Sequence, residues 1–349
     1  MVDRRGYRSL EVELPGFFNA GRGFKLRTIL CDMLGIRYPI LQGAMGSIGP
    51  RKIAGPVLVA AVSNAGGLGI LPTWGRSALE LQGEIRQTKL LTRKPFGVNL
   101  VPLSPEFIAE RIRVIIEEGV SVVTTGRGDP RERTVQKLKR EGITVIPVVP
   151  TVALARRVEE EGADAVVASG AEAGGHVGQV AAMPLVPQVV DAVKIPVIAA
   201  GGIADGRGIA AALVLGACGV QLGTRFLATR ESGLLEPAAQ VLLKSTDEDT
   251  AVTPVLTGKP VRIIADEKVR RMLNELKETT DDATRTEIIS ELRRRAKTEN
   301  SQVILPGGQG AGLIREILGA EEVIQRLVKE TRESLKRLNM VETAGTQSL

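Results

Sequence analysis

Residues 195–224 decide the fold, and they read IPVIAAGGIADGRGIAAALVLGACGVQLGT. An aliphatic run ends there in paired glycines, an alanine-rich segment of helix length follows, and a second aliphatic run again ends at a glycine. Aliphatic runs this short, bounded by Gly or Pro, are typical of buried strands. Two strands joined by a helix-length segment predict a βα unit of a parallel sheet, because the crossover has to return the chain to the same end.

The same alternation recurs along the chain, which carries eight short aliphatic runs separated by amphipathic segments. The segments Pro105–Glu118, Asp129–Glu141 and Val152–Glu161 have helical periodicity, and a glycine follows each of them. Glycine tolerates the left-handed backbone that ends many helices. The eight predicted strands are Pro39–Gln42, Leu68–Leu71, Phe96–Leu100, Val120–Thr124, Thr144–Val149, Ala165–Ser169, Pro196–Ala200 and Gly219–Gly223.

Eight βα units predict an α/β fold, a closed parallel (β/α)₈ TIM barrel. An open doubly wound sheet is the structural alternative. Aromatic residues make up only 3% of the chain, so the core has to be built from aliphatic side chains. This composition favours buried parallel strands over an aromatic-rich β-sandwich.

We predict that the chain has three parts: an extension, the barrel and an insertion. Residues 1–25 form an N-terminal extension, and the barrel comprises residues 26–228 and 310–338. Between these two parts, residues 229–309 are rich in charge and are predicted to form a smaller, mainly helical insertion after strand eight, on the substrate side. The last helix is predicted to begin near Gly312.

Charge and cysteine content point to an ordinary reduced protein. The net charge is +6, which could attract acidic partners, but Lys and Arg alternate with Glu and Asp as on solvated helix faces. Two cysteines are too few for a disulfide framework. No secretory signal and no stretch of about 18 apolar residues is visible. We therefore expect a cytoplasmic protein that binds a small molecule, but neither nucleic acid nor membrane.

Two glycine-rich strand exits lie where barrels usually bind phosphate, after strands seven and eight. The first reads AAGGIADG, from Ala200 through Gly201 and Gly202 to a helix capped by Asp205; the second ends in Gly223 and Thr224. Glycines let backbone amides approach phosphate oxygens closely, and the threonine could add a hydroxyl donor. The alternative is that these glycines only shape turns; phosphate binding is the favoured interpretation.

His176 is the chain's single histidine, and it follows Gly174 and Gly175 in the loop after strand six. A lone histidine is often structural, but this one stands at the rim where barrels carry catalytic groups. Histidine suits proton transfer near neutral pH, so His176 is the catalytic candidate. Glu172 could orient it, or could be an ordinary surface glutamate.

Other strand exits carry ligand-binding candidates. Gly43, Ala44 and Met45 after strand one could line a flat ring, although an ordinary turn is equally compatible with them. Asn99 and, with less force, Gln221 are polar residues in aliphatic strands, suited to bonding either a ligand or backbone groups.

Several site classes are excluded. Gly206, Gly208 and Ala211 fit the dinucleotide pattern G-x-G-x-x-A, but they stand inside a predicted helix and not at a strand's tight turn. One histidine leaves no multi-histidine metal site, so no metal is expected. No phosphate loop and no nucleophile elbow occur in the sequence.

At these residues the chain resembles the nitronate monooxygenase family, formerly 2-nitropropane dioxygenases. The resemblance covers roughly residues 34–330, through GIRYPILQGAMG, AAVSNAGGLGIL, PFGVNL, GAEAGGHVG, GVQLGTRFLA and GQGAGLI. The segments VVTTGRGDP and VIPVVPTVALA look especially like the related FMN-dependent enoyl-acyl carrier protein reductases. One departure is SIGPRKIAGP at 47–56, which is unlike the family's continuous first helix.

The resemblance implies FMN on a (β/α)₈ barrel, with His176 facing the substrate. The segment from Gly43 to Met45 would lie along the isoalloxazine ring, Asn99 would bond the flavin region, and the exits of strands seven and eight would hold the phosphate. The implied cofactor-binding residues are Gly43, Ala44, Met45, Asn99, Gly170, Gly174, Gly175, Ala200, Gly201, Gly202, Gln221, Gly223, Thr224 and Gln309.

We consider three hypotheses for the function. In the first, an alkyl nitronate reduces FMN and oxygen completes the turnover. In the second, NADH or NADPH reduces FMN for an enoyl thioester or a quinone, with acyl carrier protein as a partner. The third is a non-catalytic flavin-binding protein. A homodimer is an oligomeric state compatible with each of them.

Overall fold

The computed structural model describes residues 26–46, 52–101, 103–126, 134–297 and 304–345. The predicted extension 1–25 and the first part of the predicted helix Asp129–Glu141 lie outside these residues. The described part of that helix is α5, Thr134–Arg140.

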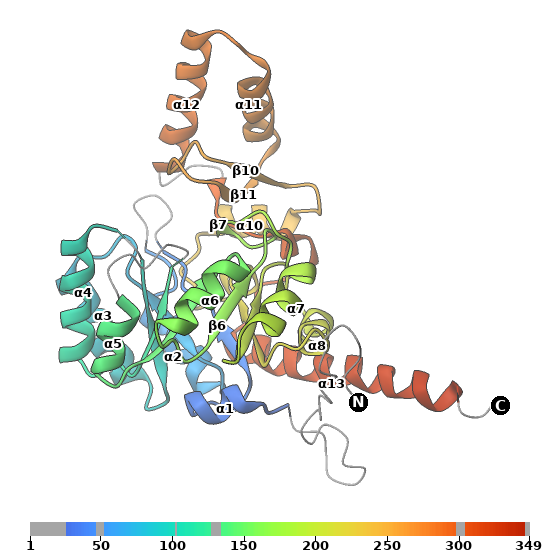
Figure 1. The fold of residues 1–349 in the computed structure, drawn as a ribbon. Coiled ribbons are helices and arrows are strands. Elements are labelled where there is room, and N and C mark those ends of the chain that lie inside the picture. The colour runs from blue at the N-terminus through green and yellow to red at the C-terminus, as the bar shows by residue number, and fades with distance from the viewer. Residues whose placement is uncertain (1–25, 47–51, 102, 127–133, 298–303, 346–349) are drawn as a thin grey trace, which may run out of the picture.

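Eight parallel strands form the barrel, which confirms the predicted fold (Figure 1). Their order is β1-β9-β8-β6-β5-β4-β3-β2, and a parallel bridge between Leu41 and Leu68 joins the two ends. This closure excludes the open doubly wound sheet. The strands are β1 (Ile40–Gln42), β2 (Gly69–Pro72), β3 (Phe96–Leu100), β4 (Val122–Thr125), β5 (Thr144–Val149), β6 (Val166–Ser169), β8 (Val197–Ala200) and β9 (Gly219–Leu222).

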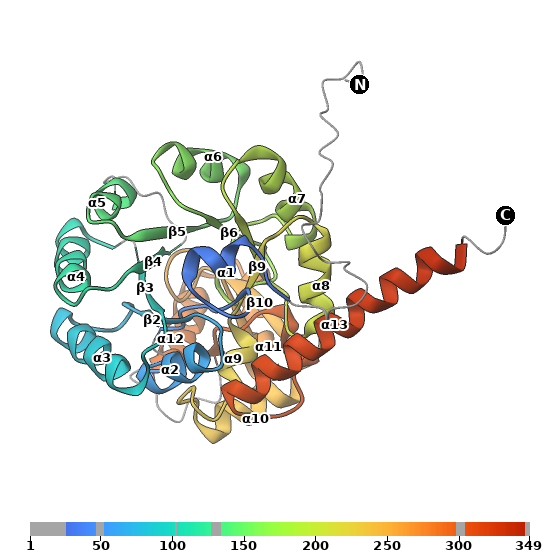
Figure 2. The same cartoon turned by 90° about the horizontal axis from the view of Figure 1, so that it is seen from below.

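Helices surround the strands in a ring (Figure 2). Their starts follow local capping rules: Ser77, Ser104 and Thr151 each accept a backbone amide of the first turn. The predicted helix-ending glycines after α4, α5 and α6 all have positive φ. The ring consists of α2 (Pro56–Asn64), α3 (Ala78–Leu91), α4 (Pro105–Glu117), α5, α6 (Val152–Glu160), α7 (Ala182–Ala192), α8 (Gly206–Val214) and α13 (Ala320–Gly345).

A short helix, α1 (Ile29–Leu34), closes the end of the barrel that faces the viewer in Figure 2. Its buried Leu30, Cys31 and Leu34 pack with inward side chains of the strands, among them Ile146 and Ile198. The opposite rim, where the carboxyl ends of the strands lie, is therefore the open end available for a site.

The last helix begins later than predicted. The chain from Gln309 to Leu313 forms the 3-10 turn η1, and α13 begins only at Ala320. Glu322 accepts the amide of Gly319 and so fixes the start of the helix there. Gly310 of η1 packs instead against the rim, at the carbonyl of Gly202, and Gly312 packs against Thr246 and Asp247.

After β9 and the short α9 (Thr224–Leu227), the chain leaves the barrel. It forms α10 (Glu236–Lys244), β10 (Thr250–Thr253), β11 (Val261–Ala265), α11 (Glu267–Glu278), α12 (Asp282–Lys297) and β12 (Ile304–Leu305). We call the part from β10 to β12 the inserted lobe; it stands above the barrel in Figure 1. The insertion has the predicted helices, but its small antiparallel sheet was not predicted. The residue boundaries of the three predicted parts stay a prediction.

Candidate active site

The predicted site residues gather at the open rim, because the carboxyl ends of parallel strands share one end of a barrel. They follow or end five elements: Gly43, Ala44 and Met45 after β1, Asn99 in β3, Gly170 after β6, Ala200, Gly201 and Gly202 at β8, and Gln221, Gly223 and Thr224 at β9. Gly174, Gly175 and His176 lie in the loop after β6, and Gln309 begins η1.

The exits of β6 and β8 touch each other through glycines. The amide of Gly170 donates to the carbonyl of Ala200 at 2.8 Å. Gly201 and Gly202 both have positive φ, and a Cβ added to Gly201 would lie 3.1 Å from the backbone of Gly170. Close packing of the two exits therefore explains the need for glycine at Gly201, whereas a Cβ at Gly170 would instead meet Ala182 and Glu172 at 2.3 Å.

Gly223 differs from these glycines. Its φ is −105°, and a Cβ added there would meet nothing within 4 Å. It precedes α9 without a side-chain cap, and the neighbouring Thr224 accepts the amide of Gly308 through Oγ1 at 2.9 Å. The protein itself does not fill the space beside Gly223, so this exit has room for a ligand.

Glu172 holds the loop after β6 in place. Both its carboxylate oxygens lie 2.9 Å from the amide of Ala182, at the start of α7, where a negative charge is favourable. Its carbonyl accepts the amide of Gln309 at 2.9 Å, which joins η1 to the same loop. These bonds give Glu172 a structural function in the loop that carries His176.

His176 lies in a two-residue strand, β7 (Gly175–His176), that pairs antiparallel with β11 of the inserted lobe. His176 is opposite Val261, and its ring Nε2 lies 3.0 Å from Oγ1 of Thr257. The strand β7 lies at the base of the lobe, next to the barrel (Figure 1), and the side chain of His176 is half-buried. The structure therefore connects the predicted catalytic residue to both parts of the molecule.

Of the polar candidates on the other strands, Asn99 has a hydrogen-bond partner and Gln221 packs beside Gly43. Asn99 Nδ2 donates to Thr124 Oγ1 at 2.9 Å, which links β3 to β4. Gln221 lies beside Gly43, where an added Cβ would come within 3.2 Å of its Cγ. Glycine at Gly43 thus leaves room for the Gln221 side chain at the rim.

Sequence reasoning missed Gln42, which is fully buried at the end of β1. Its Oε1 accepts the amide of Ile70 at 3.1 Å, and its Nε2 donates to the carbonyl of Gly43. Gln42 therefore fixes the β1 exit and helps to close the barrel between β1 and β2. The signal available in the sequence was the polar Gln42 at the end of an aliphatic strand.

Arg262 was also missed. Its Nε donates to the carbonyl of Ala171 at 2.9 Å, and its Nη1 donates to Thr250 Oγ1 at 2.8 Å. Burial lowers the pKa of this guanidinium, and the charge of Glu172 partly opposes that effect. Arg262 thus joins the β6 exit loop to β10 and β11, and nothing local in the sequence distinguishes it from a surface arginine.

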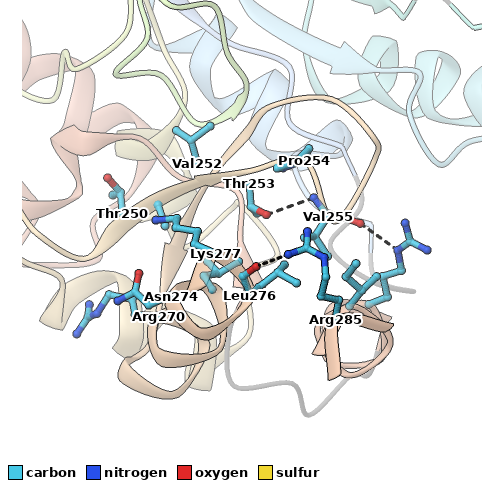
Figure 3. A pocket seen from close by; sticks show the side chains of 14 residues that line it. Thr250, Val252, Thr253, Pro254, Val255, Arg270, Asn274, Leu276, Lys277 and Arg285 are labelled. Atoms are coloured by element: carbon cyan, nitrogen blue, oxygen red, sulfur yellow. Dashed lines mark hydrogen bonds between the residues drawn. The ribbon is translucent and has the colours of Figure 1, made fainter. Parts of the chain in front are cut away.

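A cavity of about 900 Å³ lies in the inserted lobe, between β10 and the two long helices (Figure 3). Its lining includes Arg270, Arg285 and Arg293, but each donates to backbone oxygens: Arg285 to Leu276 and Thr279, Arg293 to Val255, and Arg270 to Ala265. These cations hold the lobe together, and the cavity is separate from the predicted site residues.

Two other features bear on the kind of site. Among the described residues, no three His, Cys, Asp or Glu side chains come together as a metal site would require. Within the same residues, no helix combines the length and apolarity needed to cross a membrane.

Comparison with known proteins places this barrel in a family. The family model described as nitronate monooxygenase matches residues 27–109 and 102–330. A probable nitronate monooxygenase of Staphylococcus saprophyticus is 36% identical over 90% of this chain and 100% of its own length.

Two further relatives have other names. The (3aS,4S,5R,7aS)-5-hydroxy-7a-methyl-1-oxo-octahydro-1H-indene-4-carboxyl-CoA dehydrogenase of Rhodococcus jostii is 44% identical over 68% of this chain, a match that spans 66% of that relative's length. The structure of FabK from Thermotoga maritima superimposes with a TM-score of 0.81 at 40% identity, covering 90% of this chain and 99% of FabK.

The family model covers most of the barrel and its insertion, and one relative matches over its full length. The chain therefore belongs to the nitronate monooxygenase family and is an oxidoreductase.

Proposed function

We propose that this chain is an FMN-dependent enzyme that oxidises alkyl nitronates with O₂, and that His176 is its catalytic residue. The observation that carries the proposal is the position of His176, at the open rim between the glycine-rich strand exits and the inserted lobe. The family model and the Staphylococcus saprophyticus relative support the choice of nitronate as the substrate.

The rim has features that suit FMN. Open space lies beside Gly223, and the Thr224 hydroxyl, which accepts from Gly308, still has its own proton to donate. Backbone amides and one hydroxyl are the donors that phosphate requires. We assign the phosphate to the exits of β8 and β9, and the ring to Gly43, Ala44 and Met45. When bound, the flavin would supply the redox chemistry.

Residues of the chain would transfer protons, stabilise charge and orient the ligand. The imidazole of His176 would remove the α-proton from a nitroalkane, since histidine exchanges protons near neutral pH. Backbone amides at the rim would stabilise negative charge. Asn99, held by Thr124, would keep a fixed orientation toward the ligand.

A stopped-flow experiment tests the activity. The purified, flavin-loaded chain is mixed anaerobically with propionate-3-nitronate or with nitropropane, and loss of the visible flavin absorbance is followed. We expect rapid bleaching by both, reversed by oxygen, and in His176→Gln a rate reduced about 10²-fold or more with nitropropane, whose α-proton must first be removed. Unchanged bleaching by nitropropane in that variant would remove His176 from the mechanism.

Gly223→Ala tests the phosphate assignment. Because the added methyl group meets no protein atom, the apoprotein should keep its stability while FMN binds more weakly. Gly83→Ala is the matched control, since that residue also has open space around it but lies in α3, away from the rim. Equal FMN affinity in all three proteins would place the phosphate elsewhere.

A second activity is supported by the other two relatives. One acts on a CoA thioester by its name, and FabK shares 40% identity over almost its whole length. NADH or NADPH would then reduce the flavin, and an enoyl thioester or a quinone would take the hydride, with acyl carrier protein as a partner. Bleaching by NADH or NADPH, followed by turnover of crotonyl thioester, would favour this activity. Bound flavin without either turnover would indicate a non-catalytic protein.

A further inference from the structure

We propose that Thr257 of the inserted lobe is a positioning residue for His176. Thr257 accepts a hydrogen bond from Nε2–H of the imidazole, which fixes the tautomer whose basic lone pair is on Nδ1. The inference rests on the catalytic role proposed for His176.

The hydroxyl of Thr257 is itself oriented by its own turn. Oγ1 lies 3.0 Å from His176 Nε2 and 3.3 Å from the carbonyl of Lys259, and the amide of Lys259 lies 3.4 Å from the same oxygen. A hydroxyl has one proton and two lone pairs. The carbonyl of Lys259 can only accept, so it takes the proton, and the lone pairs of Oγ1 face Nε2–H and the Lys259 amide.

The backbone holds the two partners at this distance. His176 and Val261 are paired in the β7–β11 ladder, and the amide of Val177 donates to the carbonyl of Pro260 at 3.1 Å. Arg262 adds the bond to the carbonyl of Ala171 described above. Thr257 and His176 therefore approach each other on backbone segments that are already joined on both sides of the contact.

The bond to Thr257 determines which ring nitrogen of His176 can act as a base. In a neutral imidazole one nitrogen donates and the other accepts, and the bond made by one nitrogen sets which of them has the proton. With Nε2–H bound to Thr257, the ring accepts a proton through Nδ1. A mixed tautomer would leave part of the enzyme with its base on the wrong nitrogen.

The experiment uses the fact that the chain has one histidine. Protein labelled with ¹⁵N-histidine gives one pair of ring nitrogen signals, whose shifts distinguish a protonated from an unprotonated nitrogen. Above the titration midpoint of the ring we expect Nε2 protonated and Nδ1 unprotonated. The reverse assignment in the wild-type protein would overturn the proposal.

Two variants separate positioning from folding. Thr257→Val is isosteric but cannot accept the bond, and we expect a tautomer mixture and a kcat about tenfold lower with little change in KM. Thr257→Ser keeps the oxygen and should restore both readouts. A wild-type tautomer in Thr257→Val would also overturn the proposal. The ring signals are read without substrate, so a failure of the nitronate assay leaves this test intact.

Discussion

At the scale of single residues, both thiols lie at the closed end of the barrel, Cys31 buried and Cys218 half-buried. Burial raises the pKa of Cys218 to about 12 and also raises the pKa of Cys31. At pH 8 the thiolate fraction of Cys218 is then on the order of 10⁻⁴. We expect a disulfide reagent such as Ellman's reagent to label neither thiol in the native protein and both after denaturation. Rapid labelling in native buffer would contradict the burial.

Gly201→Ala should destabilise the protein. Its φ of +103° is a backbone conformation that alanine rarely adopts, and the added Cβ would press on Gly170 at 3.1 Å. Such strain costs about 1–3 kcal/mol. Urea unfolding of the apoprotein should show this loss, whereas Gly223→Ala should unfold like the wild type. Equal destabilisation by both substitutions would contradict the difference we draw between the two strand exits.

Residue by residue, the site was predictable where the signal is local. Gly201, Gly202 and His176 follow short aliphatic runs, so their position at the rim followed once the strands were recognised. Thr257 and Arg262 were not predictable, because their partners lie 81 and 91 residues away in the sequence. A threonine in a turn and an arginine in a strand carry no sign of such contacts.

At the scale of elements, α3 provides a test of pH dependence. Its N-terminus is a capping box: Ser77 Oγ accepts the amide of Glu80, and Glu80 accepts the amide of Ser77. The hydrogen bond from Lys52, followed by the bonds from Ser77, lowers the pKa of Glu80 to about 2.

The lowered pKa of Glu80 determines how the free energy of unfolding changes with pH. A carboxylate with a depressed pKa in the folded protein stabilises it above the unfolded pKa of about 4.5, and this contribution is lost as the pH falls toward 2. Glu80→Gln keeps a side-chain acceptor for the cap but does not titrate. We therefore expect the free energy of unfolding to fall less steeply between pH 4.5 and 2 in the variant, as urea titrations at each pH would show. Parallel curves for the two proteins would exclude the effect.

The elements themselves were predictable to different degrees. The barrel strands were recognised because they are short, mostly aliphatic and mostly buried runs, and most lie next to Gly or Pro residues. The two-residue β7 and β12 were not, since strands so short exist only through their pairing with β11. The start of α13 was misplaced because the apolar pattern continues through η1, where packing of Gly310 against the rim overrides it.

At the scale of the whole molecule, the ring of helices is completed by a helix that follows the insertion. In α8, Gly206 donates its amide to Glu330 Oε2 at 2.9 Å, and an added Cβ would lie 2.3 Å from Cβ of Glu330. Gly206→Ala should therefore push α13 from α8 and cost about 1–3 kcal/mol, measured by thermal unfolding. A variant as stable as the wild type would show that this contact is dispensable.

The inserted lobe should open before the barrel does. Its buried side chains, such as Val269 and Leu292, form a small cluster separate from the main core of strands and helices. Local opening free energies follow the amount of apolar contact, so amides of β11 should exchange at a lower free energy than those of β5 and β6.

Hydrogen exchange of the Val177 amide reports whether the segment that carries His176 opens together with the lobe. It follows β6 in the chain, but its amide is bonded to Pro260 of the inserted lobe. Because β7 is held by β11, opening of the lobe should break this bond, and native-state hydrogen exchange should group Val177 with the lobe amides. The hydrogen bond between His176 and Thr257 would then break whenever the lobe opens. The stability of the lobe would therefore set the fraction of molecules in which Thr257 orients the imidazole. Exchange of Val177 at the free energy of the barrel strands would show that the loop keeps its position without the lobe.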